Sequence, residues 1–535
     1  MKYRIRNRLT RKKPRKVKFN KVEKKNYFPE PCTDDMSFQD CELAILRQAV
    51  DENQDKAKKS NANSDEVKEM IVMVEEFLRE TKCICYGGTA INNILPEEAQ
   101  FYDRDVEIPD YDFFSETPLA HAKELADRFH AKGYTDVEAK AGVHFGTYKV
   151  FVNFIPMADI TALHPDLYKS IQKDAITIDG ILYTPPNYLR MSMFLELSRP
   201  SGDVSRWEKV LKRLTLLNQY YPLKAKECHT VDFQRELASA NDSEKLHYAV
   251  RDAFIEQQVV FFGGYATSLY SRYMKFHAKR AVMSIPDFDV LHEDPEKCAN
   301  FAQQRLKEHG FTKSKIILHH EVGEVVPMHY EIRVGEDTLG FVYKPIACHN
   351  YNEIHLEGKA IRVATIDTML SFYLAFLYTD HNYFSQYKER LLCMAQYLFD
   401  VEQKNRLSQM GLLKRFSMTC YGTQPTLESM RAEKAEMFAK LKNKRTDPLY
   451  EAWFLKYNPG EKGAKKKGKT VEVVQKSVDV KSALKSVKKE SVEKSVEKSV
   501  EKSVGNKSVR KQKRKPGKKK ATTAKKKVRF GEYLF

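Results

Sequence analysis

Two groups of residues in this chain have types and spacing suited to chemistry on phosphates. Gly87, Gly88 and Thr89 end a short apolar run and begin a segment that can form a helix. Asp110 and Asp112 flank a tyrosine further along and precede two phenylalanines. Side chains alternate along a strand, so the two carboxylates project from one face and repel each other unless a cation lies between them. Glycines let a backbone approach a phosphate closely, and helix-start N–H groups favour anions.

The combination predicts a site for Mg²⁺ or Mn²⁺ beside a cradle for a triphosphate, which is the chemistry of metal-assisted nucleotidyl transfer. Each half alone has an ordinary alternative, because a Gly-Gly pair is commonly a plain turn and a D-x-D pair a solvated strand end. A third carboxylate, Asp159, ends the apolar run "TYKVFVNFIPMADIT". An unpaired buried charge is costly, so we expect Asp159 to join the metal site and help activate the attacking hydroxyl; a helix cap is the alternative.

Apolar spacing and capping residues predict the elements that position these groups. We expect helices over 37–59, 65–80, 118–132, 188–198 and 205–220, and strands over 134–141 and 147–161. Ser64, Thr117 and Ser205 are the expected N-caps, and Gly133 ends the third helix.

The last of these helices, "SRWEKVLKRLTLLNQY", has a basic side formed by Arg206, Lys209, Lys212 and Arg213. Arg206 and Lys209 are our candidates for nucleotide contact. An ordinary solvated helix face is the alternative.

Composition limits the class of protein. A chain of 535 residues with 42% hydrophobic and 11% aromatic residues can form about three domains with large cores. It has no run of 18 apolar residues that would cross a membrane, and its basic N-terminus lacks the apolar region of a secretory signal. Nine cysteines are scattered without repeated C-x-x-C spacing. We therefore expect an intracellular protein with reduced cysteines and no zinc site.

The net charge of +19 is concentrated in the two ends of the chain. Residues 1–25 carry +12 and residues 461–535 carry +18, so residues 26–460 carry −11. Basic ends fit a polyanion such as RNA through contacts that do not depend on sequence. A solubilising or localising role is the alternative.

The chain also repeats itself. The stretches "VVFFGGYATSLY" and "IPDFDVLHEDP" resemble the glycine and aspartate motifs, and Gly264, Asp287 and Gly310 follow Gly88, Asp110 and Gly133 by 176, 177 and 177 residues. Such a constant offset indicates a duplicated domain.

The second copy differs from the first where the chemistry would occur. Aligning the copies on Pro156 and Pro345 places Cys348 opposite Asp159. Tyr265 likewise takes the place of Thr89. We therefore expect a degenerate copy, in which Asp287 and Asp289 are remnants or structural carboxylates.

The resulting fold class is α/β (α+β). We expect two tandem nucleotidyltransferase-like domains, the second degenerate, with helical N-terminal and C-terminal regions and disordered basic tails. The expected segments are a basic arm 1–34, a helical region 35–80, a catalytic domain 81–186, a helical connector 187–250, a degenerate domain 251–361, a helical region 362–457 and a Lys-rich tail 458–535.

The motifs "YGGTAIN", "PDYDFF" and "FIPMADI" resemble the DNA polymerase β-like nucleotidyltransferase superfamily. With the duplication, the layout over about 35–440 is similar to the catalytic subunits of viral poly(A) polymerases of the poxvirus and giant DNA virus kind. The resemblance implies template-independent addition of AMP from ATP to mRNA 3′ ends. It also implies metal ligation by Asp110, Asp112 and Asp159, and phosphate binding by the glycine motif.

The resemblance further implies RNA and ATP as partners, no membrane, and either self-association or a separate processivity subunit. The expected location is the host cytoplasm, in viral factories, with packaging in the virion as a further option. The expected mechanism is two-metal, in-line attack of the 3′-hydroxyl on the α-phosphate.

Rival enzymes are CCA-adding, terminal uridylyl and 2′–5′ oligoadenylate-forming transferases. The non-enzymatic rival is an RNA-binding pseudo-nucleotidyltransferase. The complete carboxylate set of the first copy counts against that rival, since the second copy shows what decay looks like.

Overall fold

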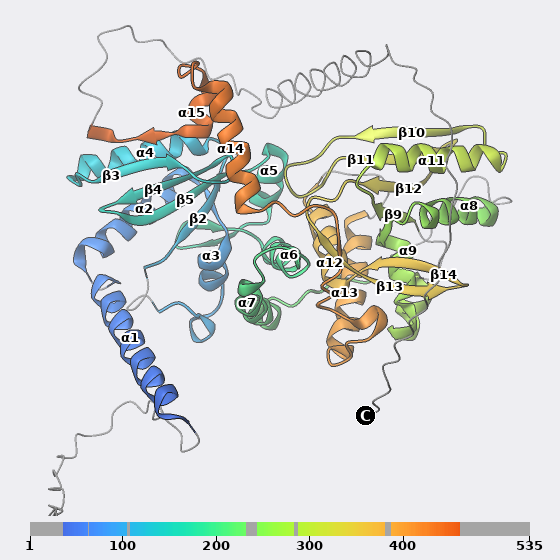
Figure 1. Cartoon of the computed structure of the whole chain (residues 1–535), viewed down its shortest axis with the longest axis horizontal. Coiled ribbons are helices and arrows are strands. Elements are labelled where there is room, and N and C mark those ends of the chain that lie inside the picture. Colours follow the sequence, from blue (N-terminus) through green and yellow to red (C-terminus); the bar gives the residue numbers. More distant parts are fainter. Residues whose placement is uncertain are drawn as a thin grey trace, which may run out of the picture. The chain divides into compact units, whose positions relative to one another are not determined.

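The computed structural model contains two mixed sheets of eight strands each, one in each half of the described chain (Figure 1). The structure describes residues 36–62, 64–103, 108–231, 243–282, 287–379 and 387–460. All of these belong to the first of two units of the chain, Met1–Lys466. The expected basic arm, and the expected Lys-rich tail from residue 461 on, lie outside the described residues.

The first sheet carries the glycine and aspartate motifs. Its strand order is β16-β3-β4-β5-β2-β1-β7-β6. The β2–β5 and β1–β7 pairs are parallel and the other pairs are antiparallel. The strands are β1 Ile84–Cys85, β2 Tyr111–Ser115, β3 Val137–Ala141, β4 Thr147–Val152, β5 Ile155–Ala162, β6 Ile176–Ile178, β7 Ile181–Tyr183 and β16 Lys456–Tyr457.

Helices cover one face of this sheet. α4 (Pro118–Lys132) contacts β3, β4 and β5, and α2 (Asp65–Thr81) contacts β5 and β7. β4 shows the consequence, because its residues alternate between buried and half-buried positions. Most of the apolar positions that the sequence spaces at helical intervals in α2 and α4 are buried here, while Ile71 and Leu119 are half-buried. The opposite face of β3, β4 and β5 therefore carries the more accessible side chains.

Most expected elements of this region are present, with one error. α4 has the predicted bounds and ends at Gly133 with φ 116°. Ser64 and Thr117 occupy their N-cap positions, although neither side chain forms a capping hydrogen bond. The single strand expected over 147–161 is wrong, since Asn153 and Phe154 turn the chain with φ of 48° and 65° and divide it into the antiparallel hairpin β4–β5.

The second sheet repeats the first in strand order and direction. Its order, β10-β11-β12-β9-β8-β14-β13-β15, matches β3-β4-β5-β2-β1-β7-β6 strand for strand, and each sheet adds one short strand from the C-terminal region at an edge. The strands are β8 Val260–Phe262, β9 Phe288–Leu291, β10 Ser314–His319, β11 His329–Val334, β12 Asp337–Tyr343, β13 His349–Leu356, β14 Lys359–Ala364 and β15 Cys420–Tyr421. The predicted duplication is thus confirmed in the fold.

The two halves meet through helices. All residues of α12 (Ile366–Phe376) are buried, and this helix packs against α6 (Pro186–Leu197). The other helices are α1 Phe38–Ala62, α3 Gly87–Ile94, α5 Pro165–Lys173, α7 Trp207–Tyr220, α8 Ser243–Glu256, α9 Gly263–Leu269, α10 Phe276–Val282, α11 Pro295–Glu308, α13 Tyr387–Asn405, α14 Leu427–Leu441 and α15 Pro448–Phe454. α8 and β14 run across two of the predicted domain boundaries, which stay predictions.

Ser205 does not cap α7 as expected. A short 3₁₀ turn, Val204–Arg206, precedes the helix, and the Asp203 side chain accepts the hydrogen bond from the Ser205 N–H.

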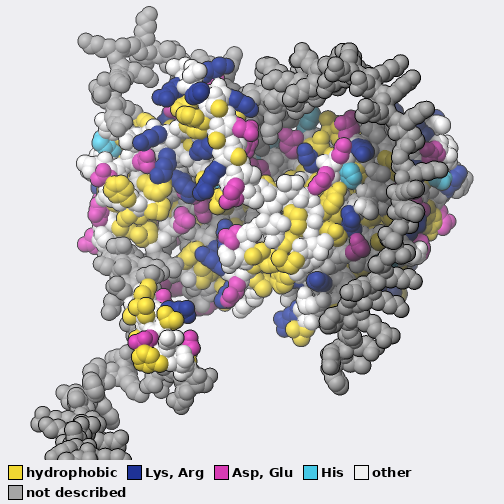
Figure 2. Space-filling view, viewed as in Figure 1, with side chains coloured by type: hydrophobic (Ala, Val, Ile, Leu, Met, Phe, Trp, Pro, Cys, Tyr) yellow, Lys and Arg dark blue, Asp and Glu magenta, His cyan; other side chains and the backbone are white. Residues whose placement is uncertain are grey.

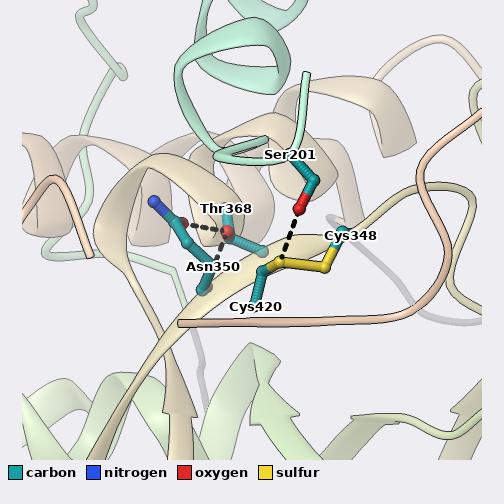
Figure 3. The surroundings of a disulfide bond; sticks show 5 residues. All are labelled: Ser201, Cys348, Asn350, Thr368 and Cys420. Atoms are coloured by element: carbon teal, nitrogen blue, oxygen red, sulfur yellow. Dashed lines mark hydrogen bonds between the residues drawn. A yellow bond between two sulfur atoms is a disulfide. The ribbon is translucent and has the colours of Figure 1, made fainter. Parts of the chain in front are cut away.

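Five of the described cysteines, Cys41 among them, form disulfides, so the expectation of reduced cysteines is wrong for them. Cys228 is bonded to Cys393, and Cys348 to Cys420. Figure 3 shows the second bond, with the Ser201 hydroxyl 3.4 Å from the Cys420 sulfur. Because Cys420 lies in β15, this bond fastens the added edge strand to the start of β13.

None of the described helices is both long and apolar enough to span a membrane.

Candidate active site

The structure brings the predicted carboxylates together at neighbouring strands. Asp112 in β2 lies directly opposite Asp159 in the parallel strand β5. Asp110 immediately precedes β2, and the intervening Tyr111 is fully buried. Residues opposite one another in adjacent strands share a face of the sheet, so Asp112 and Asp159 point to the same side, with Asp110 next to them.

Like charges and partial burial raise the pKa values of two of these groups. The pKa of Asp112 rises to about 7, chiefly through burial and then through the charges of Asp110 and Asp159. Burial of its carboxyl group and the charge of Asp159 also raise the pKa of Asp110. The site therefore carries negative charge that a cation would offset.

One lysine of the protein already faces this charge. The Lys149 ammonium donates to Asp159 Oδ2, and the two residues lie opposite each other in β4 and β5. Lys149 remains 39% exposed while Asp159 is 17% exposed, so the pair lies at the edge of solvent. The sequence analysis missed Lys149, although its alternation with the buried Tyr148 and Val150 signals that it shares the Asp159 face.

The glycine turn lies against the same carboxylates. Gly87 has φ +74°, and a Cβ there would lie 2.7 Å from Asp112 Oδ2, so only glycine fits without strain. The Tyr86 N–H donates to the Asp112 carbonyl at 2.9 Å. Thr89 donates its hydroxyl to the Asp110 carbonyl at 2.6 Å and is buried, so its hydroxyl links α3 to the approach of β2.

Helix α7 and the 3₁₀ turn before it supply positive charge to the site. Arg206 and Lys209, both predicted, act electrostatically on Asp112 and Asp110 respectively and partly offset the rise in their pKa values. Arg206 also pairs with Glu196 at 3.2 Å.

Lys212 and Arg213, the other basic residues of α7, differ in position. Lys212 is 73% exposed and pairs with Glu208 within the helix. Arg213 instead donates to the Tyr102 hydroxyl and lies 5.0 Å from the Phe101 ring centre. A Cβ on Gly88 would lie 3.0 Å from the Arg213 guanidinium, which places that cation beside the glycine turn.

The site residues fit a divalent ion in their chemistry. Carboxylate oxygens are the donors that Mg²⁺ prefers, and their mutual repulsion is the kind that a bound cation relieves. Among the described residues, however, no group of three or more His, Cys, Asp or Glu side chains is arranged as a ready metal site. The contact between Lys149 and Asp159 is consistent with that finding, because it occupies an oxygen that a metal would use.

The second sheet has lost this arrangement, although not as the sequence alignment predicted. Asp289 in β9 lies opposite Phe341 in β12, so Phe341 rather than Cys348 takes the place of Asp159. The alignment on prolines was wrong because it ignored the strand register, but the conclusion that the third carboxylate is missing holds. Asp287 lies 3.8 Å from Arg390, a partner suited to a structural carboxylate.

Tyr265 occupies the third position of α9, as Thr89 does in α3. It is a buried aromatic side chain where the first copy has a small one. The predicted replacement of Thr89 is therefore confirmed by the structure.

Comparison with known proteins finds relatives of the first domain. Residues 72–203 match the family model described as "Poly(A) polymerase catalytic subunit". The chain is 32% identical over 173 residues to the putative poly(A) polymerase catalytic subunit of African swine fever virus (strain Badajoz 1971 Vero-adapted), covering 31% of this chain and 36% of that protein. The chain is a relative of the viral poly(A) polymerase catalytic subunits.

A second viral poly(A) polymerase relative and a solved structure agree with this. The putative catalytic subunit of Acanthamoeba polyphaga mimivirus is 31% identical over 186 residues, which is 34% of this chain and 30% of that protein. The crystal structure of the Megavirus polyadenylate synthase aligns with a TM-score of 0.66 at 20% identity, covering 82% of this chain and 88% of that one. At that identity the structure supports the fold of both halves.

The sequence matches to poly(A) polymerase relatives are local. The chain spans about a third of the length of the curated relatives it matches. The family segment contains all three carboxylates and the glycine turn, whereas the basic residues of α7 and the second sheet lie beyond it.

Proposed function

We propose that this chain adds AMP from ATP to the 3′ ends of RNA without a template, and thereby forms poly(A) tails on mRNA. One observation carries the proposal: Asp112 and Asp159 on adjacent strands, and Asp110 just before the first of them, gather beside the turn at Gly87, inside the segment that matches the family. The choice of ATP rests on the family match, since the described side chains do not by themselves select a base.

The protein's own residues have defined tasks in this reaction. The missing side chains of Gly87 and Gly88 let Asp112, Tyr102 and Arg213 lie close against the start of α3, and we assign the nucleotide phosphates to this helix start. Arg213 lies beside that turn, Lys209 of the same helix acts on the carboxylates, and so does Arg206 from the 3₁₀ turn before it, so this segment can neutralise triphosphate charge.

The carboxylates provide the metal side of the site. A divalent ion held by Asp110, Asp112 and Asp159 would lower the pKa of the RNA 3′-hydroxyl and offset charge on the α-phosphate. Lys149 holds Asp159 in the absence of such an ion, which keeps this carboxylate aligned with Asp112 across the two strands.

The partners in this proposal are ATP and the RNA 3′ end. The relatives are described as catalytic subunits, which supports a further subunit, and self-association is the other arrangement. We also propose action in the host cytoplasm.

Primer extension tests the reaction directly. A labelled RNA is incubated with Mg²⁺ or Mn²⁺ and each nucleoside triphosphate separately, with wild type and with Asp110→Ala, Asp159→Ala and Asp287→Ala variants. We expect a ladder with ATP from wild type and Asp287→Ala, and none from the other two, while all four proteins bind RNA and melt at similar temperatures.

Three outcomes would contradict parts of this proposal. A ladder with UTP or CTP alone would keep the chemistry and overturn the base choice. Full activity of a folded Asp159→Ala variant would remove Asp159 from the site. RNA binding without extension by any nucleotide would favour a non-catalytic RNA-binding protein.

A further inference from the structure

A row of lysines crosses the first sheet from the carboxylates to the sheet edge. In register, each residue lies opposite the next in the series Asp112, Asp159, Lys149, Lys140 and Lys456. Side chains opposite each other on neighbouring strands project from the same face. Three ammonium groups therefore follow two carboxylates along one line, across β2, β5, β4, β3 and β16.

This row lies on the accessible face of the sheet. α2 and α4 cover the other face, whereas the side chains of Lys149 and Lys140 are 39% and 43% exposed and Lys456 is exposed. With about 4.8 Å between strands, the three steps from Asp159 to Lys456 span about 14 Å. Figure 2 shows Lys and Arg side chains gathered over the part of the molecule where Figure 1 has β4, β5 and α14.

An aromatic ring accompanies the lysines. The Lys140 ammonium lies 4.0 Å from the centre of the Phe151 ring, which belongs to β4 on the same accessible side. Alternating cationic and aromatic groups are typical of surfaces that hold single-stranded nucleic acid, where cations contact phosphates and rings stack on bases.

The second sheet serves as an internal reference for this row. Its register places Asp289 opposite Phe341, Phe341 opposite Glu331, and Glu331 opposite Ile317. The positions of Lys149 and Lys140 are thus taken by a glutamate and an isoleucine in a sheet of the same topology. The fold by itself does not require lysines at these positions. Their presence beside the complete carboxylate set therefore indicates a role in binding a ligand.

We propose that Lys149, Lys140 and Lys456 form a track for the phosphodiester backbone of single-stranded RNA, upstream of the 3′ end that the site extends. This inference rests on the proposed function, because it assigns a path to that same substrate. Charge complementarity favours RNA: residues 26–460 carry −11 overall, and the row places three ammonium groups side by side within them, with Lys149 paired to Asp159, Lys140 paired to Glu138 at 3.1 Å, and Lys456 exposed. Lysines contact phosphates as point charges, so the track reads no sequence.

The position of the C-terminal segment supports the track. Lys456 comes from β16, the strand that joins the sheet at its β3 edge. The described chain ends three residues after this strand, at Gly460, and residues 461–535 carry 26 Lys and Arg. The row therefore runs between the carboxylates and the point where the most basic part of the chain begins.

The salt dependence of RNA binding tests the track. Affinity of the full-length chain for a fluorescent single-stranded RNA of about 20 nucleotides is measured by anisotropy without ATP, over a range of NaCl concentrations. The test protein is Lys140→Gln/Lys456→Gln, which leaves Lys149 and its carboxylate partner intact. The matched control is Lys132→Gln/Lys359→Gln, because these lysines are 53% and 44% exposed and each also forms an ion pair.

We expect the test variant to bind RNA several-fold more weakly than wild type. The slope of log K against log [NaCl] should become less steep by about 1.4, because each phosphate contact with a single strand contributes about 0.7 and two contacts are removed. The control should keep the wild-type slope, since both variants lose the same charge and retain the same tails. Lys140→Arg/Lys456→Arg should also keep it, which separates charge from structural damage.

An unchanged slope in the test variant, or an equal loss in the control, would overturn the track. The two proposals fail separately. If wild type extends RNA and the test variant keeps its slope, only the track is wrong. If the test variant loses its slope but wild type extends no primer, the proposed reaction is wrong and the track stands.

Discussion

Replacing Asp112 by asparagine tests whether the site holds charge that a metal ion can offset. Asparagine has nearly the same shape, so it keeps the contact with Gly87 while removing the carboxylate charge. In the folded protein the pKa of Asp112 is raised from 3.8 to about 7 by burial and by Asp110 and Asp159. We therefore expect the variant to be more stable than wild type at alkaline pH in the absence of metal.

The sign and size follow from proton linkage. Above about pH 4 the unfolded chain has released this proton, whereas the folded chain keeps it until about pH 7, so the free energy of unfolding falls as pH rises through this window. At about 1.4 kcal/mol per pKa unit, the difference between 3.8 and about 7 costs at most about 4 kcal/mol at pH 8. At pH 5 roughly a third of that cost applies.

Thermal unfolding converts this cost into a measurable difference. About 2.1 cal/mol/K per residue over about 400 described residues gives roughly 0.8 kcal/mol/K, so 4 kcal/mol corresponds to at most about 5 °C. The assay compares wild type and Asp112→Asn at pH 5 and pH 8 in EDTA, then after addition of Mg²⁺. Asp136→Asn, an exposed aspartate of the same domain, is the control.

Mg²⁺ should raise the melting temperature of wild type at pH 8 and have little effect on Asp112→Asn, because the variant lacks one of the proposed ligands. Equal melting temperatures of the two proteins at pH 8 in EDTA would refute the charge argument. Equal stabilisation of both by Mg²⁺ would refute the assignment of Asp112 as a ligand.

Three further predictions concern particular backbone and covalent features. Gly87→Ala should destabilise the fold by about 1–2 kcal/mol, because its left-handed φ and its 2.7 Å approach to Asp112 exclude a Cβ, and should slow primer extension at least tenfold. Phe154→Gly should increase the free energy of unfolding by about 1 kcal/mol, measured by urea denaturation, because this residue has φ 65° and its side chain is 86% exposed. Reduction of the Cys228–Cys393 and Cys348–Cys420 bonds, which close loops of 165 and 72 residues, should lower the melting temperature through a loss of about 2–4 kcal/mol each, as followed by calorimetry with and without dithiothreitol.

Local signals explain what could be predicted from the sequence. α4 was found with its bounds because Pro118 begins it, Gly133 ends it in the left-handed region, and Leu125 and Phe129 recur at helical spacing on its buried side. The pairing of Asp112 with Asp159 could be inferred because a carboxylate at the end of an apolar run needs a partner.

The errors arose where tertiary structure decides. The hairpin turn at Asn153 and Phe154 lacks a glycine, and a phenylalanine with positive φ is rare. The sequence pattern of residues 147–161 therefore predicted a single strand. The counterpart of Asp159 in the second copy depends on the register of β9 with β12, which no local pattern reveals. The disulfides join cysteines far apart in the chain, and their spacing carries no signal of pairing.

Comparison of the two sheets shows why the second cannot substitute for the first. Glu331 takes the place of Lys149 and accepts hydrogen bonds from Thr338 and His319 at 2.5 and 2.9 Å. Phe341 separates this glutamate from Asp289 along the row. A carboxylate at position 341 would lie between the carboxylates of Asp289 and Glu331, with no lysine opposite it. In the first sheet, Asp159 lies opposite Lys149. The first sheet therefore depends on the lysine beside Asp159 as much as on its three aspartates, and the second copy has lost both the third carboxylate and the lysine that would face it.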